Sequence, residues 1–144
     1  MQSQEHTCFP IWFAKIRKAV QKRQTELLKP YGLSSIHAMY LITLLHNDKG
    51  MTLRELCESL FVDKANTSRV ITTLDALGYI RKDMISKSKL KYKIYLTRQG
   101  TEVANIVAKD MKKTHEILFA SLTVVEIQTV RNVMNKVQEA VQEI

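Results

Sequence analysis

The sequence predicts a mainly α-helical fold with one small β-hairpin, an α+β arrangement, and three observations support it. Apolar residues recur at helical spacing along most of the 144 residues. Two helical segments, separated by about three residues, occupy the middle of the chain. Directly after them, apolar and polar residues alternate with the period of two that is typical of strands. Together these features predict a winged helix-turn-helix with additional N- and C-terminal helices that mediate dimerisation.

Charge and cysteine content restrict the class of partner and the compartment. The formal net charge of +8 and the isoelectric point near 9.6 favour an anionic partner: nucleic acid, a membrane surface or an acidic protein. Cys8 and Cys57 lie too far apart in sequence to suggest a disulfide framework, so we expect a reducing cytoplasm. No apolar run approaches the roughly 20 residues of a membrane span. The apolar segment 9–13 is too short for a signal peptide and Pro10 interrupts it, so we expect no membrane association.

Two helices are predicted before the central pair. The first begins at Pro10, which suits a first helical turn, and ends at about residue 29. The second begins after Ser34 or Ser35, either of which can cap it, and runs to about His46. We expect this second helix to be buried through its apolar residues Ile36, Met39, Tyr40, Leu44 and Leu45.

The central pair begins with the stretch MTLRELCESL. Thr52 and Glu55 form a capping box, which predicts a helix over 53–60. Asp63 is the expected cap of the next helix, and Gly78 takes the usual glycine position after its end. A short helix and a longer one joined by such a tight turn form a helix-turn-helix.

The second helix of this pair has an unusual polar face. In the stretch VDKANTSRVITTLDALGYI, apolar residues at helical spacing define one side, and the other side offers short polar groups around a single arginine. Such a face can enter the major groove of DNA: hydroxyls and alanine allow close approach, threonine methyls can contact a thymine methyl, and arginine can pair with guanine. The alternative is that these residues are neutral filler on a solvated helix. The predicted DNA-reading residues are Lys64, Ala65, Asn66, Ser68, Arg69, Thr72 and Thr73.

A basic hairpin follows this helix. Segments 79–85 and 91–96 alternate as strands around a loop at 86–90, and from Arg81 to Arg98 there are seven basic residues and one acidic residue. A hairpin with a basic tip directly after a helix-turn-helix is a wing, and its lysines are placed to neutralise phosphates or to enter the minor groove. The predicted DNA contacts of the wing and of the helix ends are Ser34, Ser35, Lys87, Lys89 and Lys91.

Two further helices follow the hairpin. The first starts at Thr97 and runs to about Phe119, and a second capping box, Thr123 with Glu126, starts the last one. The last helix carries a heptad-like seam of apolar residues, which a helix can bury only against another apolar helix. We expect the partner to be a second copy of the chain; the alternative is burial within one chain. The seam consists of Ile127, Val130, Met134, Val137, Val141 and Ile144.

These elements divide the chain by role. We expect an N-terminal dimerisation helix in residues 1–33, a winged helix-turn-helix DNA-binding region in residues 34–97 and C-terminal dimerisation helices in residues 98–144. All three parts are expected to form one compact unit.

The stretch VDKANTSRVITTLDALGYI, followed by YLTRQG, resembles the MarR family of winged-helix transcriptional regulators. The layout is similar over nearly the whole chain, with one helix before the winged core and two after it. The resemblance implies a homodimer that places two recognition helices in successive major grooves of a palindromic operator, with Arg69 and its neighbours as base readers and the wing in the minor groove. Where the family's wing has an Asp-x-Arg element, this sequence has Ser88, Lys89 and Leu90.

Members of this family respond to small aromatic or phenolic ligands bound between the dimer helices and the winged core. By that resemblance Trp12, Phe13, Met39 and Tyr40 are a possible effector pocket, and plain core packing is the alternative. Other members sense oxidants through a cysteine of the first helix, a region close to Cys8. The sequence does not supply the neighbours that would lower the pKa of this thiol, apart from a nearby histidine.

The sequence indicates neither catalysis nor a metal site. Its four histidines lack ligand spacing, and its four glycines build no phosphate-binding loop. We therefore expect no enzyme, no metal and no cofactor. The predicted function is that of a dimeric, sequence-specific regulator that binds double-stranded DNA, a repressor released by a small-molecule effector. The alternative is a winged-helix interaction module whose basic wing binds an acidic protein.

Overall fold

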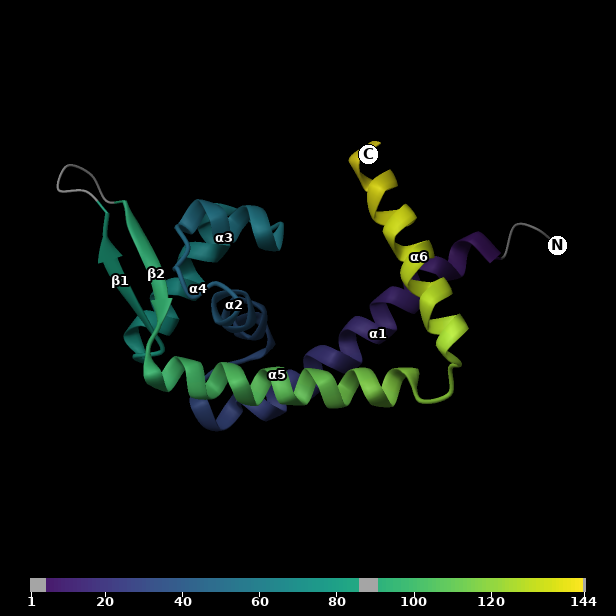
Figure 1. Ribbon diagram of the computed structural model, residues 1–144, viewed down its shortest axis with the longest axis horizontal. Helices are drawn as coiled ribbons and strands as arrows, with labels where there is room; N and C mark the ends of the chain where they lie inside the picture. The colour runs from purple at the N-terminus through teal and green to yellow at the C-terminus, as the bar shows by residue number, and fades with distance from the viewer. Residues whose placement is uncertain (1–4, 86–90, 144) are drawn as a thin grey trace. The chain divides into compact units, whose positions relative to one another are not determined.

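The computed structural model describes residues 5–85 and 91–143, and it is mainly α-helical with one β-hairpin (Figure 1). The predicted fold class is therefore confirmed. The elements follow one another as α1 (Glu5–Leu28), η1 (Lys29–Tyr31), α2 (Ser35–Leu45), α3 (Leu53–Leu60), α4 (Lys64–Ala76), β1 (Ile80–Met84), β2 (Tyr92–Leu96), α5 (Arg98–Phe119), α6 (Val124–Ala140) and η2 (Val141–Glu143).

The chain forms two compact units, Met1–Asp110 and Met111–Ile144, with the boundary inside α5. The first unit holds the helix-turn-helix and the hairpin, and the second holds α6. In the described ranges no single helix is long and apolar enough to cross a membrane; only α5 and α6 taken as a broken pair meet the length and composition required.

The first helix begins earlier than predicted. It starts at Glu5, so Pro10 lies inside the helix and not at its first position as predicted. The other end is as predicted: a 3-10 turn follows Leu28, and Gly32 closes it in the left-handed region at φ 72°. The N–H of Gly32 donates to the carbonyl of Lys29 at 3.1 Å.

The second helix is capped by Ser34, one of the two predicted caps. His37 takes the place that Glu or Gln has in most capping boxes, since its Nδ1 accepts from the Ser34 N–H at 3.1 Å. Burial lowers the pKa of His37, which favours the neutral ring that can accept this bond. The predicted buried face is only partly correct. Tyr40 and Leu44 are buried as predicted, and Leu45 is half-buried. Ile36 and Met39 are exposed to 51% and 45%, and Ala38 and Leu41 are buried in their place.

The helix-turn-helix has the predicted boundaries. The Thr52 side chain accepts from the Glu55 N–H, and the Glu55 carboxylate accepts from the Thr52 N–H at 2.7 Å, so the capping box that starts α3 is complete. Asp63 caps α4, and Gly78 follows its end at φ 79°. The turn between the helices contains Phe61, which is 96% exposed and lies in the left-handed region at φ 54°.

The hairpin is fixed to the helix-turn-helix at its base. Strands β1 and β2 pair antiparallel, with Ile80 opposite Leu96 and Met84 opposite Tyr92. Ile94 of β2 is fully buried and also pairs with Met51, exchanging hydrogen bonds of 3.0 and 2.7 Å. This bridge holds β2 beside the residue that precedes α3, and Figure 1 shows the hairpin extending from there.

One residue connects the end of α4 to the start of α5. The Thr97 hydroxyl donates to the Gly78 carbonyl at 2.7 Å and accepts from the Gly100 N–H at 3.0 Å. Gly100 cannot be replaced by a larger residue without movement, because a Cβ there would overlap the carbonyl oxygen of Tyr79. Further along α5, Asp110 forms an ion pair with Arg23 of α1 through both carboxylate oxygens.

The predicted capping box of the last helix is also present. The Thr123 side chain accepts from the Glu126 N–H at 3.2 Å, and the Glu126 carboxylate accepts from the Thr123 N–H at 2.8 Å. None of the residues described in α6 is buried in the single chain. Val124 and Val125 at its start are exposed to 79% and 73%. Of the predicted seam, Ile127, Met134 and Val137 are half-buried, Val130 and Val141 are exposed, and Ile144 lies outside the described residues.

The strained turn residue gives a first prediction. Replacing Phe61 by Gly should raise the free energy of unfolding by about 0.5–1 kcal/mol, because glycine adopts positive φ without strain and the exposed ring contributes no packing. Phe61→Ala is the matched control: it removes the ring and keeps the strain, so its stability should equal that of the wild type. Urea unfolding measures both variants, and a stabilisation of equal size in Phe61→Ala would contradict a backbone origin.

Candidate nucleic-acid interface

The buried side of α4 holds the helix against the rest of its unit. Thr67, Val70, Ile71 and Leu74 are all less than 5% exposed, at the helical spacing expected for one face. Thr67 is polar, and its Oγ1 is hydrogen-bonded to the Tyr40 hydroxyl of α2 at 3.1 Å. One of these two buried hydroxyls donates and the other accepts, and this contact fixes the rotation of α4 about its own axis.

The outward side of α4 carries the residues that the sequence predicts to read DNA. Six of the seven are exposed, namely Lys64, Ala65, Asn66, Ser68, Arg69 and Thr72, and Thr73 is half-buried. At 100° per residue Ala65, Ser68, Arg69 and Thr72 lie away from the buried stripe, whereas Lys64 flanks it and Asn66 and Thr73 lie near its edges. Two of the hydroxyls are hydrogen-bonded within the helix, Thr72 to the Ser68 carbonyl at 2.8 Å and Thr73 to the Arg69 carbonyl at 3.1 Å. Their oxygens can still accept a hydrogen bond, and their methyl groups can contact a base.

The first turn of α4 is stabilised by hydrogen bonds to its N-cap residue, Asp63. One carboxylate oxygen of Asp63 accepts from the Asn66 N–H at 2.8 Å, and the other accepts from the Asn66 side-chain amide at 2.6 Å. The backbone hydrogen bond from Asn66 is the main cause that lowers the pKa of Asp63. Asn66 is therefore engaged in the cap and is less free to reach a base than its position in the sequence suggests.

Arg69 has no ion-pair partner in the described part of the chain, and it shares this with Arg17 and Arg131. Arg23, Arg54, Arg81 and Arg98 each form an ion pair. A guanidinium in this position keeps its five donors for a ligand, and two of them can bind the two acceptors of guanine.

The base of the wing is built from cations stacked on aromatic rings. The Arg81 guanidinium lies 4.4 Å from the Tyr95 ring centre, and the Lys82 ammonium lies 5.0 Å from the Tyr92 ring centre. Lys82 also forms an ion pair of 3.4 Å with Asp75, which links the hairpin to α4. These contacts of Arg81 and Lys82 stabilise the part of the hairpin next to α4.

The structure describes only some of the residues of the wing and helix ends that are predicted to contact DNA. Lys91 is exposed at the start of the second strand segment, whereas Lys87 and Lys89 lie outside the described residues, as do Ser88 and Leu90. Ser34 and Ser35 are half-buried at the N-terminus of α2, where Ser34 is the cap and the Ser35 N–H donates to the Thr25 hydroxyl at 3.1 Å.

A hollow of about 890 Å³ lies beside these residues, and sequence reasoning missed it. It is lined by residues of 52–58, 64–68 and 91–92, and the last segment is more than 20 residues from the other two, so no local pattern could indicate it. Its walls come from α3, from the outward side of α4 and from the start of β2. The lining residues are Thr52, Leu53, Arg54, Cys57, Glu58, Lys64, Ser68, Lys91 and Tyr92.

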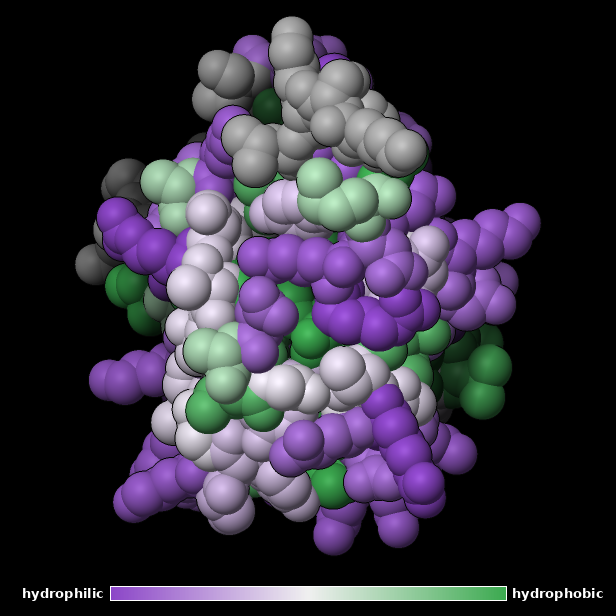
Figure 2. Space-filling model, turned by 90° about the vertical axis from the view of Figure 1, so that its left-hand side faces the viewer, coloured by the Kyte–Doolittle hydropathy of each residue, from purple (hydrophilic) through white to green (hydrophobic). Residues whose placement is uncertain are grey.

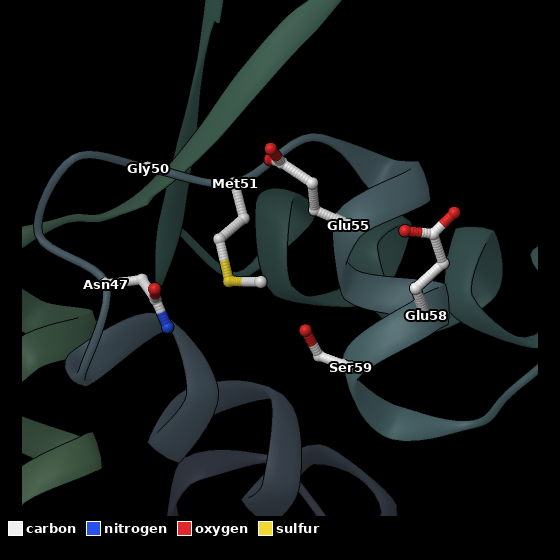
Figure 3. A pocket seen from close by; sticks show the side chains of 6 residues that line it. All are labelled: Asn47, Gly50, Met51, Glu55, Glu58 and Ser59. Atoms are coloured by element: carbon white, nitrogen blue, oxygen red, sulfur yellow. The ribbon is translucent and has the colours of Figure 1, made fainter.

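A second, smaller hollow of about 240 Å³ lies between the end of α2 and α3 (Figure 3). The Met51 side chain points into it, while the Glu55 and Glu58 side chains point away (Figure 3). Both carboxylates already have partners, since Glu55 belongs to the capping box and Glu58 accepts from Arg54 at 2.8 Å. In the described ranges no three His, Cys, Asp or Glu residues come close enough to hold a metal ion.

The four residues of the possible effector pocket differ in exposure. Tyr40 is 2% exposed and faces Thr67, whereas Trp12, Phe13 and Met39 are exposed to 60%, 40% and 45%. A ligand site formed by these residues stays a prediction. The cysteines lie outside that set: Cys57 is half-buried in α3, and the side chain of Cys8 lies outside the described residues.

The surface on the wing side is mostly hydrophilic. Figure 2 shows hydrophilic side chains over most of this face, with small apolar patches between them. An exposed surface of this kind, on a chain of net charge +8, favours binding of a polyanion.

Comparison with known proteins relates this arrangement to one family. A family model described as MarR family matches residues 31–83. The HTH-type transcriptional regulator BilQ of Clostridioides difficile is 33% identical over 76 residues, which are 53% of this chain and 51% of that protein. The match thus spans about half the length of this curated relative.

Two solved structures share the fold over nearly the whole chain. A MarR protein from Peptoclostridium difficile is 24% identical with a TM-score of 0.89, covering 99% of this chain and 92% of its own. The MepR–DNA complex of S. aureus is 14% identical with a TM-score of 0.84, covering 92% of this chain and 97% of its own. At these identities the likeness concerns the fold.

The cap of α4 gives a prediction about acid stability. Because the pKa of Asp63 is lower in the folded state than its ordinary value of 3.8, the cap stabilises the fold above that pH. This stabilisation is lost as the pH falls through the lower, folded value. Asp63→Asn keeps a good cap without the charge. Between about pH 5 and pH 3 its melting temperature should therefore fall less than that of the wild type.

Circular dichroism melts of the wild type, Asp63→Asn and Asp63→Ala test this assignment. Asp63→Ala removes the cap and should melt below both other proteins at neutral pH. Parallel pH profiles for the wild type and Asp63→Asn would show that the carboxylate does not supply the pH dependence.

Proposed function

We propose that the chain is a winged helix-turn-helix transcriptional regulator of the MarR type, which the match of residues 31–83 to that family and the likeness to a curated regulator support. In this proposal it binds a specific double-stranded DNA site through α4 and regulates transcription there. The observation that carries this proposal is the outward side of α4. It combines short polar side chains with Arg69, which has no recorded ion pair in the described part of the chain. A helix with such a side fits the major groove, whose rims are lined by phosphates.

The proposed assembly is a homodimer on a palindromic site. Two recognition helices about 34–36 Å apart are needed to read two half-sites on one face of DNA, and a single chain has one such helix. The exposed apolar residues of α6 support this assembly, because an unpaired apolar surface of this extent favours association with another chain. We place the dimer in the cytoplasm, with its DNA.

The proposed regulation is repression relieved by a small aromatic or phenolic effector. Its support is the family, together with the exposed aromatic side chains of α1. An effector acts only if its affinity differs between the DNA-binding state and the free state. A screen by thermal shift, followed by measurement of DNA release for each hit, tests this part of the proposal. If the ligands that raise the melting temperature all leave the affinity for DNA unchanged, the proposed regulation by an effector is contradicted.

A residue that contacts a base (a reader) and a residue that contacts a phosphate (an anchor) should affect DNA binding differently when each is replaced by alanine. Arg69→Ala should cost about 1–3 kcal/mol on a site selected from random duplexes and should relax base preference, because a bidentate contact to a base is lost. Lys91→Ala should weaken binding to the selected site and to random DNA by the same factor and should flatten the salt dependence by about one unit. Fluorescence anisotropy at several salt concentrations measures both. Identical behaviour of the two variants would contradict the division into reader and anchor.

The dimer has its own test. Val137→Asp or Met134→Asp introduces a charge into the seam of α6 and should reduce both self-association and affinity for the DNA site. Asn132→Asp adds the same charge on the opposite side of the helix and should leave both unchanged. Analytical ultracentrifugation reports the mass, and a monomeric wild type with full affinity for the palindrome would exclude the proposed assembly.

A further inference from the structure

A second concentration of positive charge lies on α1, apart from the wing. Between residues 11 and 31 the sequence has six basic residues and one acidic residue, Glu26. Three of the basic residues lie within about 60° of one another around the helix at 100° per residue, and we call them the lysine stripe: Lys15, Lys18 and Lys22. All three are exposed, and none has a recorded ion pair in the part of the chain that the structure describes.

The lysine stripe faces away from the core. Gln24 is buried, Val20 and Leu27 are half-buried, and all three lie roughly 150–170° around the helix from the middle of the stripe. Arg23, another basic residue of α1, is already paired with Asp110 of α5. The stripe is therefore a cationic surface on the outer side of α1, and association of the apolar side of α1 with another chain would leave it exposed.

The composition of the lysine stripe favours nucleic acid over the other anionic partners. Protein–protein interfaces are enriched in arginine and depleted in lysine. Lysine lacks the planar fork with which arginine pairs with a carboxylate, but its ammonium group binds phosphate as a point charge. A helix at a lipid surface inserts its apolar side between the head groups. In α1 this side is turned towards the protein, where Leu28 is fully buried.

The lysine stripe also lies away from the part of α4 that is proposed to read bases. The Tyr31 carbonyl, directly after α1, accepts from the Tyr79 hydroxyl, beyond the C-terminal end of α4, at 2.8 Å. A recognition helix reads bases with its N-terminal part, so α1 meets α4 at the opposite end. From there α1 runs away from the hairpin (Figure 1), and Lys22 and Lys15 lie roughly 9 and 20 Å along it from Leu28.

We infer that the lysine stripe binds the phosphates of a second DNA duplex, so that one protein assembly holds two duplexes together. This inference goes beyond the proposed function and rests on it for the first duplex, which is held through α4. Contacts to phosphate carry no sequence information, so the second duplex can have any sequence.

Capture of a second duplex tests this inference. The protein is bound to an excess of selected duplex on beads, unbound protein is washed away, and a labelled random duplex is added. The triple variant Lys15→Gln/Lys18→Gln/Lys22→Gln should retain at least about tenfold less label than the wild type, because about three phosphate contacts per chain are lost. Its affinity for the selected duplex alone, measured by anisotropy at the same salt, should stay within about twofold of that of the wild type.

Matched variants separate local charge from overall charge. Lys109, Lys112 and Lys113 are also exposed, on α5, and replacing all three by glutamine changes the net charge by the same amount. This control should retain as much label as the wild type. Arginine at the three stripe positions keeps the charge and should retain the label as well. Circular dichroism melts of all variants verify that they are folded.

The outcomes are distinct. An equal loss of label in both glutamine variants, or no label on a wild type that stays on the selected duplex, would overturn the inference and leave the proposed function standing. Weaker binding of the selected duplex by the stripe variant would place the stripe on the same duplex as α4 and would also overturn it.

Two further probes address the other anionic partners. Binding of phosphatidylserine vesicles or of labelled polyglutamate that is lost in the stripe variant, without capture of a second duplex, would assign the stripe to a lipid surface or to an acidic protein and overturn the inference. If the wild-type chain binds no duplex at low salt, the proposed function fails, and this inference with it.

Discussion

The orientation of α4, the proposed recognition helix, depends on one hydrogen bond between two buried hydroxyls, those of Tyr40 and Thr67, 3.1 Å apart. Leu74, Val70 and Ile71 bury the rest of the same side, but apolar packing alone is non-directional. The hydroxyl pair adds a direction, because rotating α4 would leave both groups buried without a partner, at about 1–3 kcal/mol each. The residues of α4 that are proposed to face DNA are held away from the core by these contacts.

The positions of the element ends follow from local chemistry that is visible in the sequence. Three helices begin at the predicted residues, because a cap needs only side chains within four positions of each other. The caps are the pair Thr52 and Glu55, the single residue Asp63, and the pair Thr123 and Glu126. Gly78 ends α4 for an equally local reason, its positive φ. The same local rules predicted the hairpin, so the fold class and the outward side of α4 could be derived without a structure.

Features that depend on distant segments could not be derived. The helix α2 is apolar around most of its circumference, so periodicity could not decide that Ala38 and Leu41 face the core while Ile36 and Met39 do not. The hollow beside α4 is lined by residues of α3, α4 and the start of β2, and only the folded chain brings these together. The hydrogen bond between the side chains of Asn66 and Asp63 is local, but it depends on side-chain rotamers, which sequence spacing does not determine.

The central claim is that the outward side of α4 enters the major groove and reads bases there. Methylation of guanine N7 tests it most directly, since the added group blocks the major-groove edge of guanine and leaves the minor groove unchanged. A duplex selected by the protein from a random pool is methylated sparsely, and bound and free fractions are separated and cleaved at the modified guanines. The account predicts that methylation at guanines within each half-site excludes a duplex from the bound fraction. Equal methylation at every guanine in the two fractions would contradict it.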